Sequence, residues 1–210
     1  MNELPFTTHV KEVSTQSAPK GLMVKVCRAE DTDCLDPEKT FQDLAGTGEV
    51  TLLLPWGWTG YLELSSNETL TSLYYMSRPV TEPVRVTSIL LITQGLISAG
   101  STFSPEPFDL DQYGLVLAQM LQCSGSPASG IRFEISDPES RQFFLLNGLP
   151  SADAALSTFD PATSQTTGSF LNVHPGSQSI RAHLGLDGPL LGQATFNVRP
   201  KTISQLQLYP

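Results

Sequence analysis

The chain has 210 residues and a formal net charge of −9, and only 16% of its residues are charged. A surface that binds nucleic-acid phosphates needs clustered Lys and Arg, so the sequence argues against a nucleic-acid partner. Apolar residues make up 40% of the chain, and Gly and Pro number 16 each. This balance predicts a folded protein of short strands and many turns rather than one of long surface helices.

The first residues carry no recognisable targeting segment. Residues 1–4 lack the basic start and apolar stretch of a signal peptide, so the chain is interpreted as cytosolic or as a mature form whose leader has been removed. Residues 1–14 are interpreted as an N-terminal tail. His9 and Glu12 in this tail have the spacing of two zinc ligands in metallocarboxypeptidases, but a catalytic zinc also needs a third ligand and a shaped pocket. No metal site is predicted there.

Alternation of apolar and polar residues predicts half-buried strands in the first half of the chain. The stretches with this period are residues 22–27, 49–54, 61–64 and 84–87. Several short strands separated by turns indicate a sandwich or a barrel, and residues 15–87 are predicted to form a first β-sandwich.

Two cysteines in this half are seven residues apart. Cys27 and Cys34 flank a polar stretch that can close as a hairpin, which permits a local disulfide and would indicate an oxidising compartment. Two isolated thiols near a turn are the alternative, and we predict the bridge. Cys123 is then left over as a free thiol, predicted to be a buried strand residue. The acidic stretch Glu30–Glu38 is interpreted as a solvated loop, and a calcium site in it is left open.

Three aromatic residues follow Pro55, and they have two interpretations. In extended chain Trp56 and Trp58 point to the same side, so that with Tyr61 they form a candidate ligand platform on which a sugar ring stacks. Gly57 and Gly60 instead indicate a tight connection, in which large rings fold back and cap the core. The second interpretation is preferred.

A change of pattern in residues 88–110 marks the domain boundary. Apolar residues at mixed spacing predict a short helix that opens at Thr87 or Ser88 and ends at Gly100. A Pro-containing connector follows at residues 104–107. Residues 111–210 are predicted to form a second β-sandwich, with a long loop at residues 151–165 and strands at residues 113–123, 131–135, 142–146, 169–173, 179–184, 193–198 and 202–209.

A repeat supports the tandem interpretation. The separation from Gly48 to Pro55 equals that from Gly168 to Pro175, and in both cases a strand-like stretch lies between the two residues. Gly21 and Gly130 open an earlier strand in each half, where a turn glycine supplies positive φ.

The segments 124–133 and 166–176 resemble the carboxypeptidase regulatory-like domain. They match its small residue and Pro before a Gly and an apolar strand, and its second Gly and strand ending in Pro175-Gly176. The Asp that the family carries before Gly168 is absent. The resemblance implies a transthyretin-like β-sandwich, of which residues 15–87 look like a divergent copy. The arrangement is similar to secreted or lipid-anchored proteins of myxobacteria and their relatives.

The remaining motifs give no chemistry. Three dispersed histidines make no site, with His174 expected to hydrogen-bond at a turn and His183 to lie on a strand, and neither a nucleophile elbow nor a phosphate-binding glycine loop is present. We therefore expect no enzyme, no catalytic residue and no cofactor.

Two tandem transthyretin-like or Ig-like sandwiches, joined by a short helix and a Pro-containing linker, are the predicted all-β fold. The expected function is a non-catalytic structural or interaction protein that is secreted or anchored at the outer membrane and cell surface. The expected partner is a protein or a polysaccharide, and membrane contact runs only through a lipid anchor. The alternative function is a carbohydrate-binding module that uses Trp56, Trp58 and Tyr61.

Overall fold

The computed structural model describes residues 2–101, 108–146, 149–151, 156–157, 159–160 and 165–210. Strands make up 54% and helix 3% of the chain, which confirms the all-β prediction. The chain divides into two compact units, Met1–Ile97 and Ser98–Pro210, and each is described by itself. No helix among the described residues is both long and apolar enough to cross a membrane.

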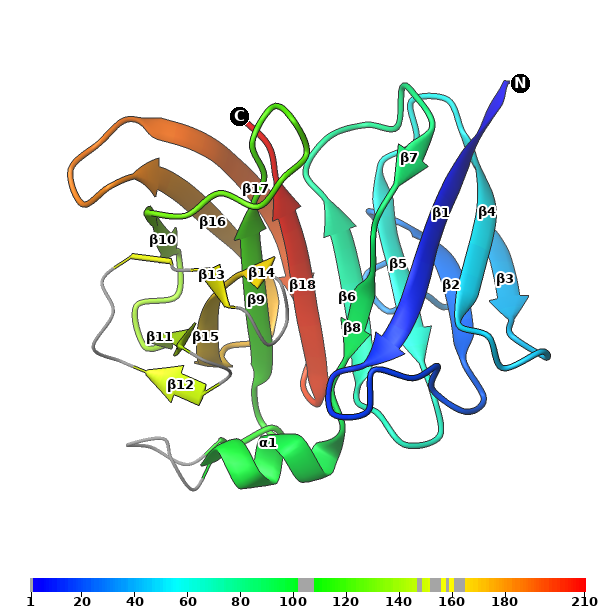
Figure 1. The fold of residues 1–210 in the computed structure, drawn as a ribbon, viewed down its shortest axis with the longest axis horizontal. Coiled ribbons are helices and arrows are strands. Elements are labelled where there is room, and N and C mark those ends of the chain that lie inside the picture. The colour runs from blue at the N-terminus through cyan, green and yellow to red at the C-terminus, as the bar shows by residue number, and fades with distance from the viewer. Residues whose placement is uncertain (1, 102–107, 147–148, 152–155, 158, 161–164) are drawn as a thin grey trace. The chain divides into compact units, whose positions relative to one another are not determined.

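Unit 1 contains most of the blue-to-green strands of Figure 1. These are β1 (Glu3–Glu12), β2 (Met23–Arg28), β3 (Lys39–Gln42), β4 (Glu49–Pro55), β5 (Gly60–Ser65), β6 (Thr71–Met76), β7 (Val84–Arg85) and β8 (Ile89–Leu91), and helix α1 (Gln94–Ser101) follows them.

Unit 2 contains the strands from green to red. These are β9 (Gly114–Met120), β10 (Ile131–Ile135), β11 (Arg141–Leu146), β12 (Leu149–Ser151), β13 (Phe159–Asp160), β14 (Gln165–Thr166), β15 (Gly168–Val173), β16 (Gly176–Leu184), β17 (Leu190–Val198) and β18 (Thr202–Leu208).

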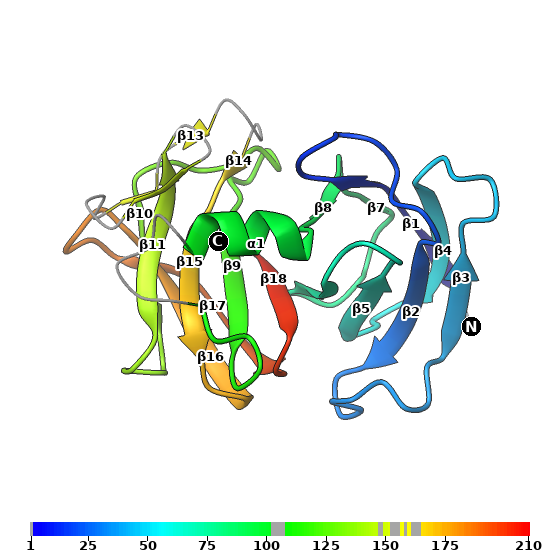
Figure 2. The same ribbon diagram turned by 90° about the horizontal axis from the view of Figure 1, so that it is seen from below.

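The strands of unit 1 form two layers, which both views show (Figures 1 and 2). In one layer β1 pairs antiparallel with β4 and parallel with β7 and β8. In the other layer β6, β5, β2 and β3 follow one another as antiparallel neighbours. Alternate residues of both layers meet in one apolar core, for example Phe6 and Val10 of β1 and Leu62 and Leu64 of β5. Burial of these side chains is the main force that holds the layers together.

The predicted N-terminal tail, residues 1–14, is wrong, because these residues contain the strand on which the first layer is built. Phe6 and Val10 are fully buried, and Thr8 between them is 5% exposed. Alternation with a period of two therefore continues to the start of the chain. Pro5 obscures this alternation in the sequence. A proline has no N–H to donate to a neighbouring strand, but on the β7 side of β1 none is needed at this position, because the pairing with β7 begins only at Phe6.

Unit 2 also has two groups of strands. In the first, β12, β11, β15 and β9 are antiparallel neighbours and β18 runs parallel to β9, while in the second β10, β16 and β17 are antiparallel. Strands β13 and β14 pair separately. A Cβ atom at Gly168 would lie 2.3 Å from the Phe133 ring, so the absence of a side chain lets β15 approach β10.

The predicted helix over residues 88–100 is wrong in its first half. Ile89–Leu91 is β8, paired with β1, and the helix begins only at Gln94. A short apolar run fits a buried strand and a helix equally well, which explains the error. The predicted connector at residues 104–107 lies outside the described residues. So does much of the predicted loop at residues 151–165, whose described parts include β13 and β14.

The matching glycines of the predicted repeat have different roles. Gly48 has a φ of +73°, and a side chain on it would also meet the Val10 carbonyl, whereas Gly168 has no positive φ and is needed for the contact with Phe133. Their strands differ too, since β4 pairs with β1 and β15 lies between β11 and β9.

Candidate functional site

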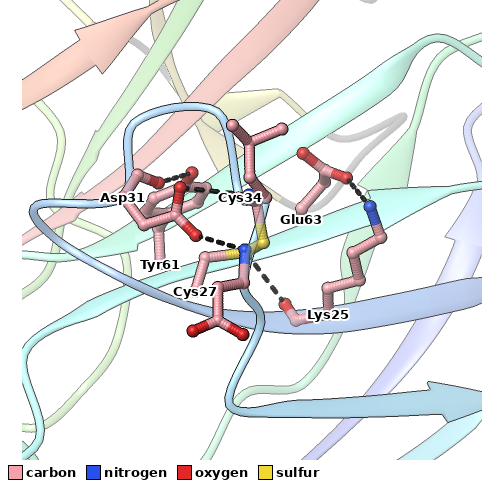
Figure 3. Close-up of a disulfide and its surroundings, with 8 residues drawn as sticks. Lys25, Cys27, Asp31, Cys34, Tyr61 and Glu63 are labelled. Atoms are coloured by element: carbon pink, nitrogen blue, oxygen red, sulfur yellow. Dashed lines mark hydrogen bonds and ion pairs between the residues drawn. A yellow bond between two sulfur atoms is a disulfide. The ribbon is translucent and has the colours of Figure 1, made fainter.

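A disulfide closes the loop that connects β2 to β3. Cys27 near the end of β2 is bonded to Cys34, with their Cα atoms 5.3 Å apart, as predicted (Figure 3). Both residues are buried, at 0% and 2% exposure. We call residues 28–38 the disulfide loop. Because the bond lies inside the protein, it fixes the loop to the sheet rather than presenting a reactive group to solvent.

Asp31 organises the loop around this bond. Its carboxylate accepts hydrogen bonds from the backbone N–H groups of Leu35 at 3.0 Å and Asp36 at 2.9 Å. Its carbonyl accepts from the Cys34 backbone at 3.0 Å and from the Tyr61 hydroxyl at 2.6 Å (Figure 3). One residue therefore satisfies backbone donors on the far side of the loop and ties the loop to β5.

An aromatic cluster lies beneath the disulfide. Cys27, Cys34, Tyr61 and Leu73 form a buried group against which Tyr75 packs. The rings of Tyr61 and Tyr75 stack, with centroids 5.1 Å apart. Sulfur–aromatic contact and ring stacking both favour this arrangement. The disulfide loop thus rests on a platform of side chains from β5 and β6.

An ion pair lies on the same face of the sheet. Lys25 and Glu63 are directly opposite each other on β2 and β5, two pairs along from Cys27 and Tyr61, and their charged atoms are 2.9 Å apart. The Glu63 side chain is only 10% exposed. An opposite-charge pair directly across two strands adds to their pairing.

The backbone at Cys34 points the next residue into solvent. Cys34 has a φ of +51°, a conformation that side-chain-bearing residues adopt only when their surroundings hold it. The disulfide and the hydrogen bond to Asp31 supply that hold. Leu35 follows and is 84% exposed, so a large apolar side chain projects from a stiff loop.

The loop is acidic at its surface. Glu30, Asp33 and Asp36 are exposed, and Glu38 forms a 2.9 Å ion pair with Arg28. Hydrogen bonding to Glu38, together with its charge, raises the pKa of Arg28. Within the described residues no group of three or more His, Cys, Asp or Glu is arranged to hold a metal. The Asp31 carboxylate already accepts backbone hydrogen bonds from Leu35 and Asp36.

The predicted ligand platform is wrong. Trp56 is 63% exposed, but Trp58 and Tyr61 are buried at 7% and 1% exposure. Gly57 has a φ of +78°, so the chain turns between the two tryptophans and their side chains do not share a face. The Trp58 ring packs on Gly60 and joins the core of unit 1, as the capping interpretation expects. The structure therefore does not support the carbohydrate-binding alternative.

The histidines take structural positions. His9 lies on β1, 3.2 Å from Glu49, while Glu12 accepts hydrogen bonds from Ser14 and Thr15 instead of facing His9. His183 is on β16, with Glu134 of β10 3.7 Å away. Neither arrangement gathers the ligands of a catalytic metal.

His174 is hydrogen-bonded at its turn, as expected. Its backbone N–H and ring Nδ1 lie 2.7 and 3.0 Å from the buried carboxylate of Asp137. Burial opposes ionisation of Asp137, but hydrogen bonds from the backbone of His174 and Glu139 and from the His174 ring outweigh it and hold its pKa below the usual value. The pair joins two turns of unit 2.

Cys123 is free, but the prediction that it is a buried strand residue is wrong. It is exposed, in a turn after β9 ends at Met120. Strand β9 ends three residues earlier, so the apolar residues that precede Cys123 did not determine its burial.

Comparisons with known proteins give no family. No family model matches the sequence, and no curated protein matches it. Similar solved structures include the TIE protein of Bacillus anthracis, with a TM-score of 0.29 and 8% identity over 99% of this chain and 34% of that chain. This chain therefore spans about a third of the Bacillus anthracis protein.

Two pilins are similar at the same level. The D295N mutant of the shaft pilin SpaA from Lactobacillus rhamnosus GG has a TM-score of 0.31 and 9% identity over 99% of this chain and 98% of that chain. A streptococcal ancillary pilin has a TM-score of 0.30 and 10% identity over 100% of this chain and 62% of that chain. These likenesses carry no argument about function, and the resemblance to the carboxypeptidase regulatory-like domain stays a prediction.

Sequence reasoning missed several residues of the site. Leu35 follows the second cysteine, and only the conformation of Cys34 shows that its side chain points outward. Tyr75 lies on β6, which buries residues on both faces, lacks the alternation of a half-buried strand and was not predicted. Asp31 was seen only as one acid among several, although Asp side chains in polar loops often hydrogen-bond to nearby backbone N–H groups.

Proposed function

We propose that this chain is a non-catalytic structural or interaction protein of the cell envelope or the extracellular space. The observation that carries the proposal is the buried Cys27–Cys34 disulfide. Disulfides of this kind form and persist in oxidising compartments and are rare in the cytosol. The bond fixes an exposed loop, which suits a protein that presents a surface outside the cell.

The finer points of the proposal extend the same idea. The two units are tandem β-sandwich modules of the carboxypeptidase regulatory-like, transthyretin-like type, which serve as spacers and adhesion units. Their support is the two groups of paired strands within each unit and the motifs of residues 124–133 and 166–176. The partner is a protein or a polysaccharide at the cell surface, and any attachment to the membrane runs through a lipid anchor.

The test combines location with the state of the cysteines. Intact cells of the source organism are treated with a protease that does not enter them, and the chain is followed with an antibody. We expect digestion of the chain without cell lysis, and alkylation of one cysteine in the denatured, unreduced protein. Two results together would contradict the proposal. The chain would be fully protected in intact cells but digested after lysis, and all three cysteines would be alkylated.

A further inference from the structure

Two loops leave the same end of unit 1. Strand β2 ends where β5 begins, because Cys27 is paired with Tyr61 and Arg28 with Gly60 (Figure 1). The disulfide loop begins at Arg28, and residues 55–60, which we call the tryptophan turn, lead into β5. Loops at one end of a packed pair of layers are where β proteins place binding residues on a rigid support.

Each of these loops carries one large apolar side chain in solvent. Leu35 is 84% exposed and Trp56 is 63% exposed. Single exposed apolar residues are common, but these two stand on neighbouring connections at the same end of the unit. Trp side chains are also over-represented among the residues that supply most of the free energy of protein–protein binding.

Both loops are held before any partner arrives. The disulfide and Asp31 fix the loop beside Leu35. In the tryptophan turn, the backbone N–H of Trp56 donates to Asn2 at 2.9 Å and that of Gly57 donates to Val80 at 2.7 Å. A side chain on a fixed backbone loses little conformational entropy when it is bound, so it contributes more of its contact energy to affinity.

The surroundings of Leu35 select the charge of the partner. Five carboxylates and one guanidinium lie in the disulfide loop, and the guanidinium of Arg28 is paired with Glu38. Glu30, Asp33 and Asp36 carry no ion pair within the described part of the chain, and all three are exposed. Charges of this kind at the rim of an interface steer association with a surface of opposite sign and repel like-charged surfaces.

We propose that this end of unit 1 docks a partner protein with a basic surface, into whose apolar pockets Leu35 and Trp56 insert. The inference rests on the proposed interaction function and names its partner chemistry. The carboxylates disfavour an anionic membrane and an acidic polysaccharide. A single exposed tryptophan lacks the second ring of the platform that the sequence offered as an alternative, so a neutral sugar is the competing outcome of the test.

The experiment selects displayed random peptides on the immobilised full chain under non-reducing conditions. We expect the recovered peptides to combine Lys or Arg with aliphatic or aromatic residues, and to bind more weakly as salt rises. The dissociation constant of the best peptide should increase about tenfold or more with Leu35→Ser and with Trp56→Ala. Both residues are exposed, so these variants keep the fold, and circular dichroism checks it.

Leu44→Ser is the matched control, because Leu44 is 86% exposed in the loop at the other end of β3. It should leave the affinity unchanged. Neutralising Glu30, Asp33 and Asp36 to their amides should slow association and flatten the salt dependence.

Three outcomes would overturn the inference. Peptides without an excess of Lys and Arg, or peptides whose affinity is the same for wild type, Leu35→Ser and Trp56→Ala, show that this end is not the docking surface. The second result leaves the proposed interaction function intact, because binding then maps elsewhere. Recovery of no peptide, with binding of a neutral polysaccharide that Trp56→Ala abolishes, assigns the end to a sugar instead.

Discussion

The short strand β3 is flanked by two loops that solve the same problem differently. Before β3, the disulfide loop is fixed by a covalent bond, by Asp31 and by aromatic side chains. After β3 come residues 43–48, which we call the Asp43 turn. They are fixed by the Asp43 carboxylate, which accepts hydrogen bonds from the N–H groups of Ala45, Gly46 and Gly48 at 3.1, 2.9 and 2.6 Å. Both loops expose a leucine almost fully.

The comparison shows that a capped turn needs no disulfide. Burial opposes ionisation of Asp43, but the backbone N–H groups of Gly48, Thr47, Gly46 and Ala45 outweigh it and lower its pKa. This is enough to order the Asp43 turn. The disulfide loop is longer and carries far more negative charge, and its carboxylates repel one another. A covalent bond holds such a loop closed where a single capping residue would compete with that repulsion.

The largest expected effect on stability concerns Trp58, which lies near the disulfide loop. A Cβ atom at Gly60 would lie 2.3 Å from the Cys27 carbonyl and 2.6 Å from the Trp58 ring, so the ring packs against Gly60, which is paired with Arg28 at the start of the loop. Replacing Trp58 by Ala should lower the free energy of unfolding by about 3–5 kcal/mol, the usual cost of truncating a buried Trp. Urea unfolding measures the change. Trp56→Ala is the control, and an equal loss in both variants would refute the different burial of the two rings.

The second effect concerns the covalent bond itself. The double variant Cys27→Ala, Cys34→Ala should lose about 2–3 kcal/mol, as expected for opening a loop of this length without strain. The Asp43 turn should be unaffected. Amide hydrogen exchange separates the two, with faster exchange at Leu35 and Asp36 and unchanged protection at Gly46 and Gly48. Unchanged exchange at Leu35 would show that Asp31 alone fixes the loop.

Much of the fold was predictable, because alternation marks strands whose two faces differ. Strands β2, β4, β5 and β10 each lie within two residues of their predicted positions. The failures share a cause, which is that the pattern was absent or masked. Strand β6 buries residues on both faces, such as Leu73 and Tyr74. Its sequence therefore shows neither the period of a half-buried strand nor that of an amphipathic helix.

The candidate site was predictable in its chemistry but not in its geometry. The spacing of Cys27 and Cys34 was sufficient to propose their bond, since a seven-residue separation across a polar loop fits a closed hairpin. The orientation of the tryptophan side chains could not be predicted from their spacing. It depends on the φ of Gly57, and a glycine permits both the extended and the left-handed conformation.

A third effect tests the Asp43 turn directly. Asp43→Ala leaves three backbone N–H groups without their acceptor and should cost about 1–2 kcal/mol. Asp43→Asn keeps one oxygen acceptor and should cost less. Thermal unfolding measures both. Asp31→Ala serves as the comparison, and its loss should be the smaller one because the disulfide still closes its loop.

The same carboxylate gives the turn a pH dependence. The pKa of Asp43 is lower in the folded state than in the unfolded chain, where it is about 3.9, so the folded state binds fewer protons. Its contribution is therefore complete above the unfolded pKa and is lost as pH falls through the folded value. The wild type should lose stability more steeply than Asp43→Asn below about pH 4. Parallel curves would show that the carboxylate charge does not matter.

The smallest effect is expected at the two exposed leucines, and it separates stability from binding. Leu35→Ser and Leu44→Ser remove side chains that make little contact with the protein, so each should change the free energy of unfolding by less than about 0.5 kcal/mol. Chemical denaturation measures this in the same series as the other variants. If neither leucine stabilises the isolated chain, its exposure is explained by binding or has no function, and the two loops are expected to differ in this respect. Only Leu35 stands on a covalently closed, acidic loop, so only Leu35→Ser should weaken a basic partner. A stability loss above 1 kcal/mol for Leu35→Ser would show that its side chain packs on the loop, and would remove it as a binding residue.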